Sequence, residues 1–163
     1  MGKKTVISII MGSDSDLPVM NEALKVLERH GIPFETKILS AHRSPDDVAK
    51  FARAARARGI KIIIAGAGGA AHLAGVVASL TTIPVIGVPM ETKELKGVDS
   101  LFSIVQMPSG VPVATVTIGR TGAKNAAILA LEILSLSDKS IERKLDAFKK
   151  ELADGVRKKN RQI

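Results

Sequence analysis

Residues 40–45 carry the side chains best suited to acid–base chemistry. The segment reads Ser-Ala-His-Arg-Ser-Pro and follows an expected strand over residues 34–39. His42 has the side chain most easily tuned for proton transfer near neutral pH, and Arg43 beside it could clamp a phosphate or a carboxylate. Because His42 lies between a strand end and a clear helix start, we expect it to serve chemistry rather than packing alone.

Residues 11–16, which read Met-Gly-Ser-Asp-Ser-Asp, follow the first expected strand. Gly12 permits a tight turn, and Ser13 and Ser15 offer hydroxyl groups ahead of a helix whose free backbone N–H groups favour an anion. The carboxylate of Asp16 could accept hydrogen bonds from ribose hydroxyls. The same residue types also cap helices, so the segment fits either a phosphate and ribose site or simple helix capping.

Residues 65–73, which read Ala-Gly-Ala-Gly-Gly-Ala-Ala-His-Leu, follow the third expected strand. Gly66, Gly68 and Ala71 match a loose dinucleotide-binding pattern, but the acidic residue expected about 20 positions later is missing. The short side chains instead predict a backbone that approaches a small ligand closely. His72 is then either a second polar contact in the site or a buried histidine whose hydrogen bonds are satisfied.

Other catalytic signatures are missing from the sequence. It has no G-x-x-x-x-G-K-[ST] phosphate-binding loop and no G-x-S-x-G nucleophile segment, and its three histidines and lack of cysteine argue against a zinc site. His30 is expected at the surface, at the end of a helix. From the residues alone, the chain is predicted to bind a phosphorylated, ribose-bearing small molecule, with His42 as acid and base.

Short β-branched runs alternate with helical stretches along the chain, which predicts an α/β fold. Strands are expected over residues 5–10, 34–39, 60–65, 84–88 and 112–118, and helices over about 17–30, 45–58, 71–80, 97–105, 121–136 and 138–158. The second helix has the clearest limits, with Ser44 as N-cap, Pro45 at its first position and Gly59 as its stop. We expect a single-domain, three-layer α/β/α sandwich with a central parallel sheet, flavodoxin-like or Rossmann-like, plus a C-terminal helix. Ligands of such sheets bind beyond the carboxyl ends of the strands, where the three segments fall.

The composition fits one globular domain. The chain has 163 residues, of which 45% are hydrophobic and 25% charged, and it has no cysteine, which excludes disulfides and thiol catalysis. We expect one catalytic domain over residues 1–163, with a core of about 5–136 and a C-terminal helix of about 138–158. Because the sequence shows no signal peptide and no membrane-spanning run, the expected compartment is the cytoplasm.

The net charge of +8 raises the possibility of a nucleic-acid partner. The chain has no Trp and no Tyr on which bases could stack, so neither nucleic acid nor a membrane is an expected partner. The expected C-terminal helix carries an apolar stripe. Its members are Ile141, Leu145, Phe148 and Leu152. The stripe packs either on its own domain or on a neighbouring subunit.

Taken together, the three segments resemble the N5-carboxyaminoimidazole ribonucleotide mutase family, the catalytic subunit of the phosphoribosylaminoimidazole carboxylase step of purine synthesis. The likeness covers residues 6–134 and rests on residues 11–16, 40–45, 65–73, 97–101 and 103–108. It implies an isomerase that converts N5-carboxyaminoimidazole ribonucleotide (N5-CAIR) into 4-carboxy-5-aminoimidazole ribonucleotide (CAIR) in the synthesis of inosine monophosphate, with no metal or organic cofactor. In this family the substrate loses carbon dioxide, and C4 of the aminoimidazole ring then attacks the trapped molecule.

The resemblance also implies roles for individual residues. By position, His42 matches the family's acid/base residue. Arg43 and the loop hydroxyls are expected at the phosphate, and Asp16 at the ribose. The expected substrate-binding residues are Gly12, Ser13, Ser15, Asp16, Ser40, Ala41, Arg43, Ala67, Gly68, Gly69, His72 and Leu73. Residues 67–69 with His72 and Leu73 are expected to line the carbon dioxide pocket.

The resemblance further implies a homo-octamer with sites at subunit contacts, and a functional link to the ATP-dependent enzyme that makes N5-CAIR. Two alternatives stay open: a direct carboxylase that adds carbon dioxide to aminoimidazole ribonucleotide (AIR), and a non-catalytic nucleotide-binding module. The carboxylase type typically has Lys after the histidine and lacks the Gly-Gly-Ala-Ala-His stretch. Arg43 and residues 68–72 therefore favour the mutase.

Overall fold

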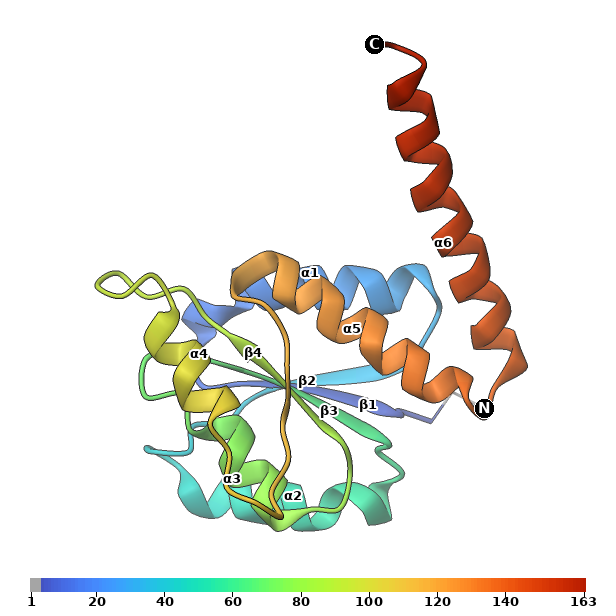
Figure 1. The fold of residues 1–163 in the computed structure, drawn as a ribbon. Coiled ribbons are helices and arrows are strands. Elements are labelled where there is room, and N and C mark those ends of the chain that lie inside the picture. Colours follow the sequence, from blue (N-terminus) through green and yellow to red (C-terminus); the bar gives the residue numbers. More distant parts are fainter. Residues whose placement is uncertain (1–3) are drawn as a thin grey trace. The chain divides into compact units, whose positions relative to one another are not determined.

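Five parallel strands form the sheet in the computed structural model, which describes residues 4–163 (Figure 1). Their bounds are β1 (Ile7–Met11), β2 (Phe34–Ile38), β3 (Ile62–Ala67), β4 (Val85–Pro89) and β5 (Ala114–Thr115). The strand order is β2-β1-β3-β4-β5, and every neighbouring pair runs parallel. This order is the flavodoxin-like one, whose switch point lies between β1 and β3. The predicted α/β class is therefore confirmed.

The helices follow the strands along the chain. They are the short 3-10 helix η1 (Asp14–Asp16), then α1 (Leu17–Arg29), α2 (Pro45–Arg58), α3 (Leu73–Leu80), α4 (Val98–Val105), α5 (Gly119–Ser135) and α6 (Lys139–Asn160). Two compact units divide the chain, one ending at Ala127 and the other spanning Ile128–Ile163, so that α5 crosses the boundary. No helix within residues 4–163 has both the length and the apolar character that a membrane span requires.

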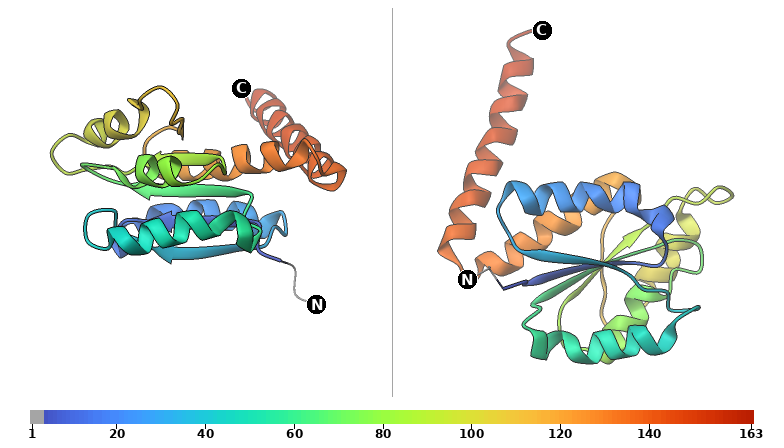
Figure 2. Two further views of the ribbon diagram at one scale, coloured as in Figure 1. Left: turned by 90° about the horizontal axis from the view of Figure 1, so that it is seen from below. Right: turned by 180° about the vertical axis from the view of Figure 1, so that it is seen from behind.

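Helices cover both faces of the sheet in the first unit. Figure 2 (right) shows α1 on one side of the strands and α2 on the other, and α3 lies beside α2. The part of α5 before Ala127 lies against α1, where the Lys124 Nζ is 3.2 Å from a Glu22 carboxylate oxygen. Hydrogen bonds from Lys25 and Lys124 lower the pKa of the Glu22 carboxyl. The predicted three layers are thus present.

The core is built on β1, β3 and β4, whose residues are all buried. A strand covered on both faces shows no alternation of apolar and polar side chains, which explains the continuous apolar runs in the sequence. Ser8 is the polar exception within β1. Its hydroxyl is fully buried and donates a hydrogen bond to Glu35 Oε1 on β2 at 3.1 Å.

Two strand predictions differ from the structure. β3 starts and ends two residues later than expected, so that Gly66 and Ala67 belong to the strand. A Cβ on Gly66 would lie 2.6 Å from Met90 Cε and 2.7 Å from Met20 Sδ, so a larger residue there would require one or both methionine side chains to move. β5 has two residues instead of the expected seven positions 112–118, because only Ala114 and Thr115 pair with β4.

The helix predictions hold better than the details of their caps. α2 runs from Pro45 to Arg58 and stops at Gly59, which takes the left-handed conformation at φ 89°. Ser44 occupies the N-cap position, but its hydroxyl accepts from no N–H group of α2. Instead it accepts from the N–H of Ser40 at 3.3 Å and donates to the carbonyl oxygen of Ser40 at 3.2 Å. His30 was expected at the surface, and this was wrong: it is 7% exposed, and its Nδ1 lies 2.8 Å from the carbonyl oxygen of Val26.

The second unit contains the end of α5 and the whole of α6. Asp138 caps α6 by accepting from the N–H groups of Ser140 and Ile141, and the hydrogen bonds from Ser140 lower the pKa of its carboxyl. An ion pair at 3.4 Å joins Lys149 on α6 to Glu132 on α5. The first half of the expected apolar stripe is buried and Leu152 is exposed.

Candidate active site

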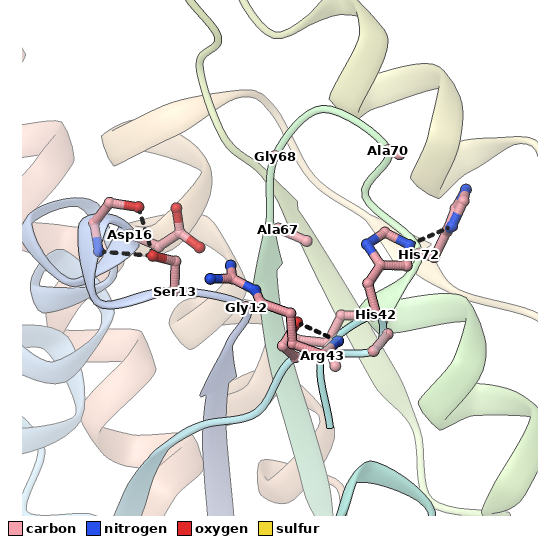
Figure 3. A pocket seen from close by; sticks show the side chains of 13 residues that line it. Gly12, Ser13, Asp16, His42, Arg43, Ala67, Gly68, Ala70 and His72 are labelled. Carbon is pink, nitrogen blue, oxygen red and sulfur yellow. Dashed lines mark hydrogen bonds between the residues drawn. The ribbon is translucent and has the colours of Figure 1, made fainter. Parts of the chain in front are cut away.

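The three predicted segments meet around one cavity of about 310 Å³ beyond the carboxyl ends of β1, β2 and β3 (Figure 3). The residues lining it are Gly12, Ser13, Ser15, Asp16, Ser40, Ala41, His42, Arg43, Ala67, Gly68, Ala70, His72 and Leu73. All the predicted site residues except Gly69 are among them. Parallel strands bring these segments together because their carboxyl ends share one edge of the sheet.

His42 and His72 form a hydrogen-bonded pair in this cavity. The Nε2 of His42 lies 2.9 Å from the Nδ1 of His72, and the two rings meet edge to face with their centroids 5.0 Å apart (Figure 3). One nitrogen must donate and the other accept, so the pair holds a single proton between the rings. Both side chains are exposed, and His72 stands at the first end of α3. Two roles were expected for His72, a second polar contact in the site or a buried histidine, and this exposed position supports the first.

Ser13 and Ser15 form a local hydroxyl cluster at η1. Ser13 Oγ accepts from the backbone N–H of Ser15 at 3.3 Å, and Ser15 Oγ lies 2.9 Å from Ser13 Oγ. Ser13 Oγ also donates to Asp14 Oδ1 at 3.1 Å. The segment therefore does cap η1, as one of the two interpretations stated, and the same hydroxyls line the cavity.

Asp16 lies half-buried beside this cluster. Burial raises the pKa of its carboxyl because it removes water from the charged form, and the nearby Asp14 charge acts in the same direction. Hydrogen bonds from Ser13 and Ser15 offset part of the effect. The Asp16 carboxylate makes no capping bond to α1, so it can accept hydrogen bonds from a ligand.

Arg43 brings the positive charge to the cavity. Its side chain extends towards the side where Ser13 and Asp16 lie (Figure 3). Within residues 4–163, no carboxylate lies within ion-pair distance of its guanidinium. The backbone N–H of Arg43 donates to Ser40 Oγ at 3.2 Å. This bond stabilises the loop and leaves the guanidinium group unpaired. An uncompensated guanidinium beside several hydroxyls suits a phosphate group.

The glycine-rich segment forms the remaining wall. Ala67 is buried at the end of β3, and Leu73 is 2% exposed. Gly69 takes a left-handed conformation at φ 66°, and its N–H donates to Ser100 Oγ on α4 at 2.9 Å. The sequence prediction missed Ala70, although its small side chain belongs to the same run. It also gave no role to Ser100, which lies in a segment that carried the family resemblance.

Within residues 4–163, no group of three or more histidine or acidic side chains is placed to hold a metal ion. The cavity presents imidazole, guanidinium, carboxylate and hydroxyl groups. Groups of these kinds can bind a phosphorylated sugar and move a proton.

The flavodoxin-like sheet carries this cavity beyond the carboxyl ends of its strands, where α/β proteins of this class bind their ligands. The family model described as AIR carboxylase matches residues 6–155. The chain therefore belongs to the AIR carboxylase family.

Known relatives agree with this assignment. An N5-carboxyaminoimidazole ribonucleotide mutase from Pyrococcus horikoshii is 55% identical over 99% of this chain and 90% of its own length. A protein of the same name from Thermotoga maritima is 56% identical over 96% of this chain and 91% of its own length. The crystal structure of Treponema denticola PurE superimposes with a TM-score of 0.89, at 29% identity over 98% of both chains.

Proposed function

We propose that the chain is an isomerase of purine biosynthesis that converts N5-CAIR into CAIR. The observation that carries this proposal is the His42–His72 pair, which shares one cavity with Arg43 and Asp16 in a chain of this family. The cavity thus combines a proton carrier with groups for a ribose phosphate. Relatives that bear the mutase name match this chain over nearly its whole length.

The substrate is held by its ribose phosphate. The guanidinium of Arg43 and the hydroxyls of Ser13 and Ser15 bind the phosphate, and the carboxylate of Asp16 accepts from the ribose hydroxyls. The position of these groups supports this arrangement, because Arg43 extends to the side of the cavity that holds the serines. The aminoimidazole ring then lies towards the two histidines, at the other side of the cavity.

His42 moves the proton in both halves of the reaction. The bond between N5 and the carboxylate carbon breaks, carbon dioxide leaves, and N5 takes a proton from the protonated His42. C4 of the ring then forms a bond to the carbon of carbon dioxide, and neutral His42 removes the C4 proton. The proton count closes, because His42 returns to its protonated form at the end of the cycle. No metal ion is needed in these steps.

His72 sets which nitrogen of His42 faces the substrate. In the observed pair Nε2 of His42 is engaged with His72, which leaves Nδ1 for the substrate. When His42 is protonated, its Nε2–H donates to Nδ1 of His72, and this bond stabilises the charged ring. The small residues Ala67, Gly68 and Ala70, with Leu73, form an apolar wall that keeps the carbon dioxide beside C4.

The single catalytic domain over residues 1–163 works as a homo-octamer in this proposal, with the helix at 138–158 packed on a neighbouring subunit. One exposed surface of α4 supports the assembly. Val98, Phe102 and Val105 lie four and three residues apart and are 46%, 57% and 48% exposed, which is unusual for a helix face of a lone subunit. A second copy of the chain would cover this stripe.

Light scattering of wild type and of Phe102→Glu tests the octamer. We expect wild type to be an octamer that dissociates in the variant, and a wild-type monomer would contradict the proposal.

One observation keeps a second candidate in view. The matching family model is described as AIR carboxylase, so direct carboxylation of AIR with carbon dioxide must be tested. Freshly made N5-CAIR is supplied in one reaction and AIR plus bicarbonate in the other, without ATP or added metal. Efficient conversion of N5-CAIR alone is expected. Efficient conversion of AIR plus bicarbonate would move the chain to the carboxylase type, and turnover of neither would leave a nucleotide-binding module.

The instability of N5-CAIR points to a functional link with the enzyme that makes it. N5-CAIR carries a labile carbamate, so an ATP-dependent carboxylating enzyme must supply it nearby. We expect that functional link, with both enzymes in the cytoplasm. Co-purification of the two proteins, or faster product formation when both are present than their separate rates allow, would test the link.

A further inference from the structure

The peptide groups around Gly69 are held on two sides by α4. The N–H of Gly69 donates to Ser100 Oγ at 2.9 Å. The single hydroxyl proton of Ser103 is shared between two carbonyl oxygens, that of Asp99 on the same helix at 2.8 Å and that of Gly69 at 3.1 Å. Ser100 is fully buried, and Ser103 is half-buried. No residue of α4 lines the cavity, so this helix acts on the site only through the loop that it holds.

Gly69 is the point where the cavity wall turns. Its φ of 66° belongs to the left-handed region, and a Cβ there would meet no atom within 4 Å. Glycine is therefore required by the backbone conformation and not by lack of space. The carbonyl oxygen of Gly69 also accepts from the N–H of Ala71 at 2.8 Å, and α3 begins at Leu73. Fixing Gly69 thus fixes the turn that carries Ala70 and His72 to the cavity.

The helix that holds Gly69 is itself firmly placed. A Cβ on Gly87 of β4 would clash with Ile104, a fully buried residue of α4, so the helix rests directly on the strand. At the other end of α4, Thr92 Oγ1 donates to Asp99 Oδ1 at 2.8 Å and accepts from the N–H of Gly97 at 3.1 Å. The helix is therefore a fixed support for a loop that contains no large side chains of its own.

We propose that Ser100 and Ser103 are positioning residues that hold the Gly69 turn closed over the carbon dioxide pocket. This inference rests on the proposed function, in which carbon dioxide must stay beside C4 until the new bond forms. Carbon dioxide has no charge and few hydrogen-bonding options, so only the walls retain it. A loosened turn would let it escape and would release AIR instead of CAIR. The two serines thus control how decarboxylation and recarboxylation are coupled.

The ratio of AIR released to CAIR formed measures this coupling directly. Ser100→Ala removes the acceptor of the Gly69 N–H, and we expect the AIR-to-CAIR ratio to rise roughly five- to tenfold, the effect of losing one partly buried hydrogen bond. The KM for N5-CAIR should stay within about twofold, because the phosphate and ribose contacts lie elsewhere. Ser103→Ala should raise the ratio less, since the N–H of Ala71 still satisfies the Gly69 carbonyl.

Two controls separate positioning from general damage. Ser79→Ala removes a serine on α3 whose hydroxyl donates to Val76 O at 2.8 Å outside the cavity, and its AIR-to-CAIR ratio should match wild type. Ser103→Thr keeps the hydroxyl and should restore coupling. If Ser100→Ala does not fold, the Ser103 pair carries the test alone. A wild-type ratio in both alanine variants, or an equal rise in Ser79→Ala, would overturn the proposal.

Amide hydrogen exchange separates this proposal from the proposed function. In Ser100→Ala, exchange should speed up in residues 69–72 relative to wild type, and it should not do so in Ser79→Ala. Unchanged exchange in the serine variants would reject the role of α4 in holding the turn, whatever reaction the enzyme performs. If wild type fails to convert N5-CAIR while exchange rises as expected, the proposed function falls, the link to carbon dioxide retention falls with it, and the structural support of the turn stands.

Discussion

The two sides of the cavity are built by different kinds of contact. On the side of residues 12–16 and 40–44, the side-chain hydrogen bonds other than that of His42 join groups one to four positions apart, such as Ser13 to Ser15 and Ser40 to Ser44. On the side of residues 67–73, the supporting bonds reach from Gly69 to α4, 31 and 34 positions away. The first side is a pair of polar turns that hold themselves, and the second depends on a distant helix. The His42–His72 bond joins the two sides.

The two sides should therefore respond differently to substitution. A locally held turn keeps its shape when one side chain is lost, so substitutions there should remove a chemical group and little else. A remotely held turn changes shape when its support is lost, so substitutions there should alter the course of the reaction.

His42→Asn should have the largest effect. The variant keeps the turn, because the side chain of His42 supports none of its bonds, but it loses the group that carries the proton. We expect kcat to fall by about 10²–10⁴, the usual contribution of general acid–base catalysis, with nucleotide binding retained. Single-turnover kinetics and calorimetric binding of AIR check this. Near-normal turnover would remove His42 from the proton transfer.

Arg43→Ala should act mainly on binding. The guanidinium has no acidic partner among residues 4–163, so its loss leaves no buried charge unpaired. We expect KM to rise roughly 10- to 100-fold, the value of one or two charge-assisted bonds to phosphate, with little change in the thermal midpoint. Arg53→Ala removes the same charge from an exposed position on α2 and serves as the matched control. Equal KM values in both variants would rule out a phosphate role for Arg43.

His72→Asn tests the joint between the two sides. The variant loses the imidazole that partners Nε2 of His42, so the ring of His42 is held less firmly in its orientation towards the substrate. We expect kcat to fall about tenfold, with KM for N5-CAIR within about twofold of wild type, because the proposed phosphate and ribose contacts are unchanged. A wild-type kcat in this variant would rule out a role of the His42–His72 bond in turnover.

Asp16→Asn should have the smallest effect on turnover of the four substitutions, and it should raise the stability of the folded protein at pH 7. Burial raises the pKa of this carboxyl in the folded state, so the ionised form costs stability once the pH exceeds the unfolded pKa. The variant should therefore melt at a slightly higher temperature at pH 7, and this advantage should vanish below about pH 3, where both states of wild type are protonated. Thermal melts across this pH range, with KM for N5-CAIR as the binding readout, make the check. A lower midpoint at pH 7 would contradict the desolvation argument.

The same contrast explains what could be predicted from sequence. Strand ends, glycine stops and short polar turns are set by neighbours in the chain, so the residue types around His42 and Asp16 already located the site. The parallel order of the strands then brought these segments to one edge. The limits of α2 followed from Pro45 and Gly59 for the same local reason.

What could not be predicted depends on residues far apart. The bonds from α4 to Gly69 and the burial of His30 arise only when the helices pack on the sheet, so no local sequence pattern predicts them. The expected strand at 112–118 was too long, because only Ala114 and Thr115 pair with β4. Pairing with a neighbouring strand, and not β-branched composition alone, determines the length of a strand. Ser44 has the sequence signature of a capping residue, yet its hydroxyl donates to the carbonyl oxygen of Ser40 in the preceding loop.

The methionines beside Gly66 have a further consequence, in terms of oxidation. The chain has no cysteine, and the thioethers of Met20 and Met90 lie against Gly66 near the end of β3; the two residues are 0% and 4% exposed. Peroxide converts such groups to sulfoxides only when it can reach them, so oxidation here must wait for the packing around Gly66 to open. The rate at which these two methionines gain oxygen therefore reports how often the centre of the sheet opens in the native protein.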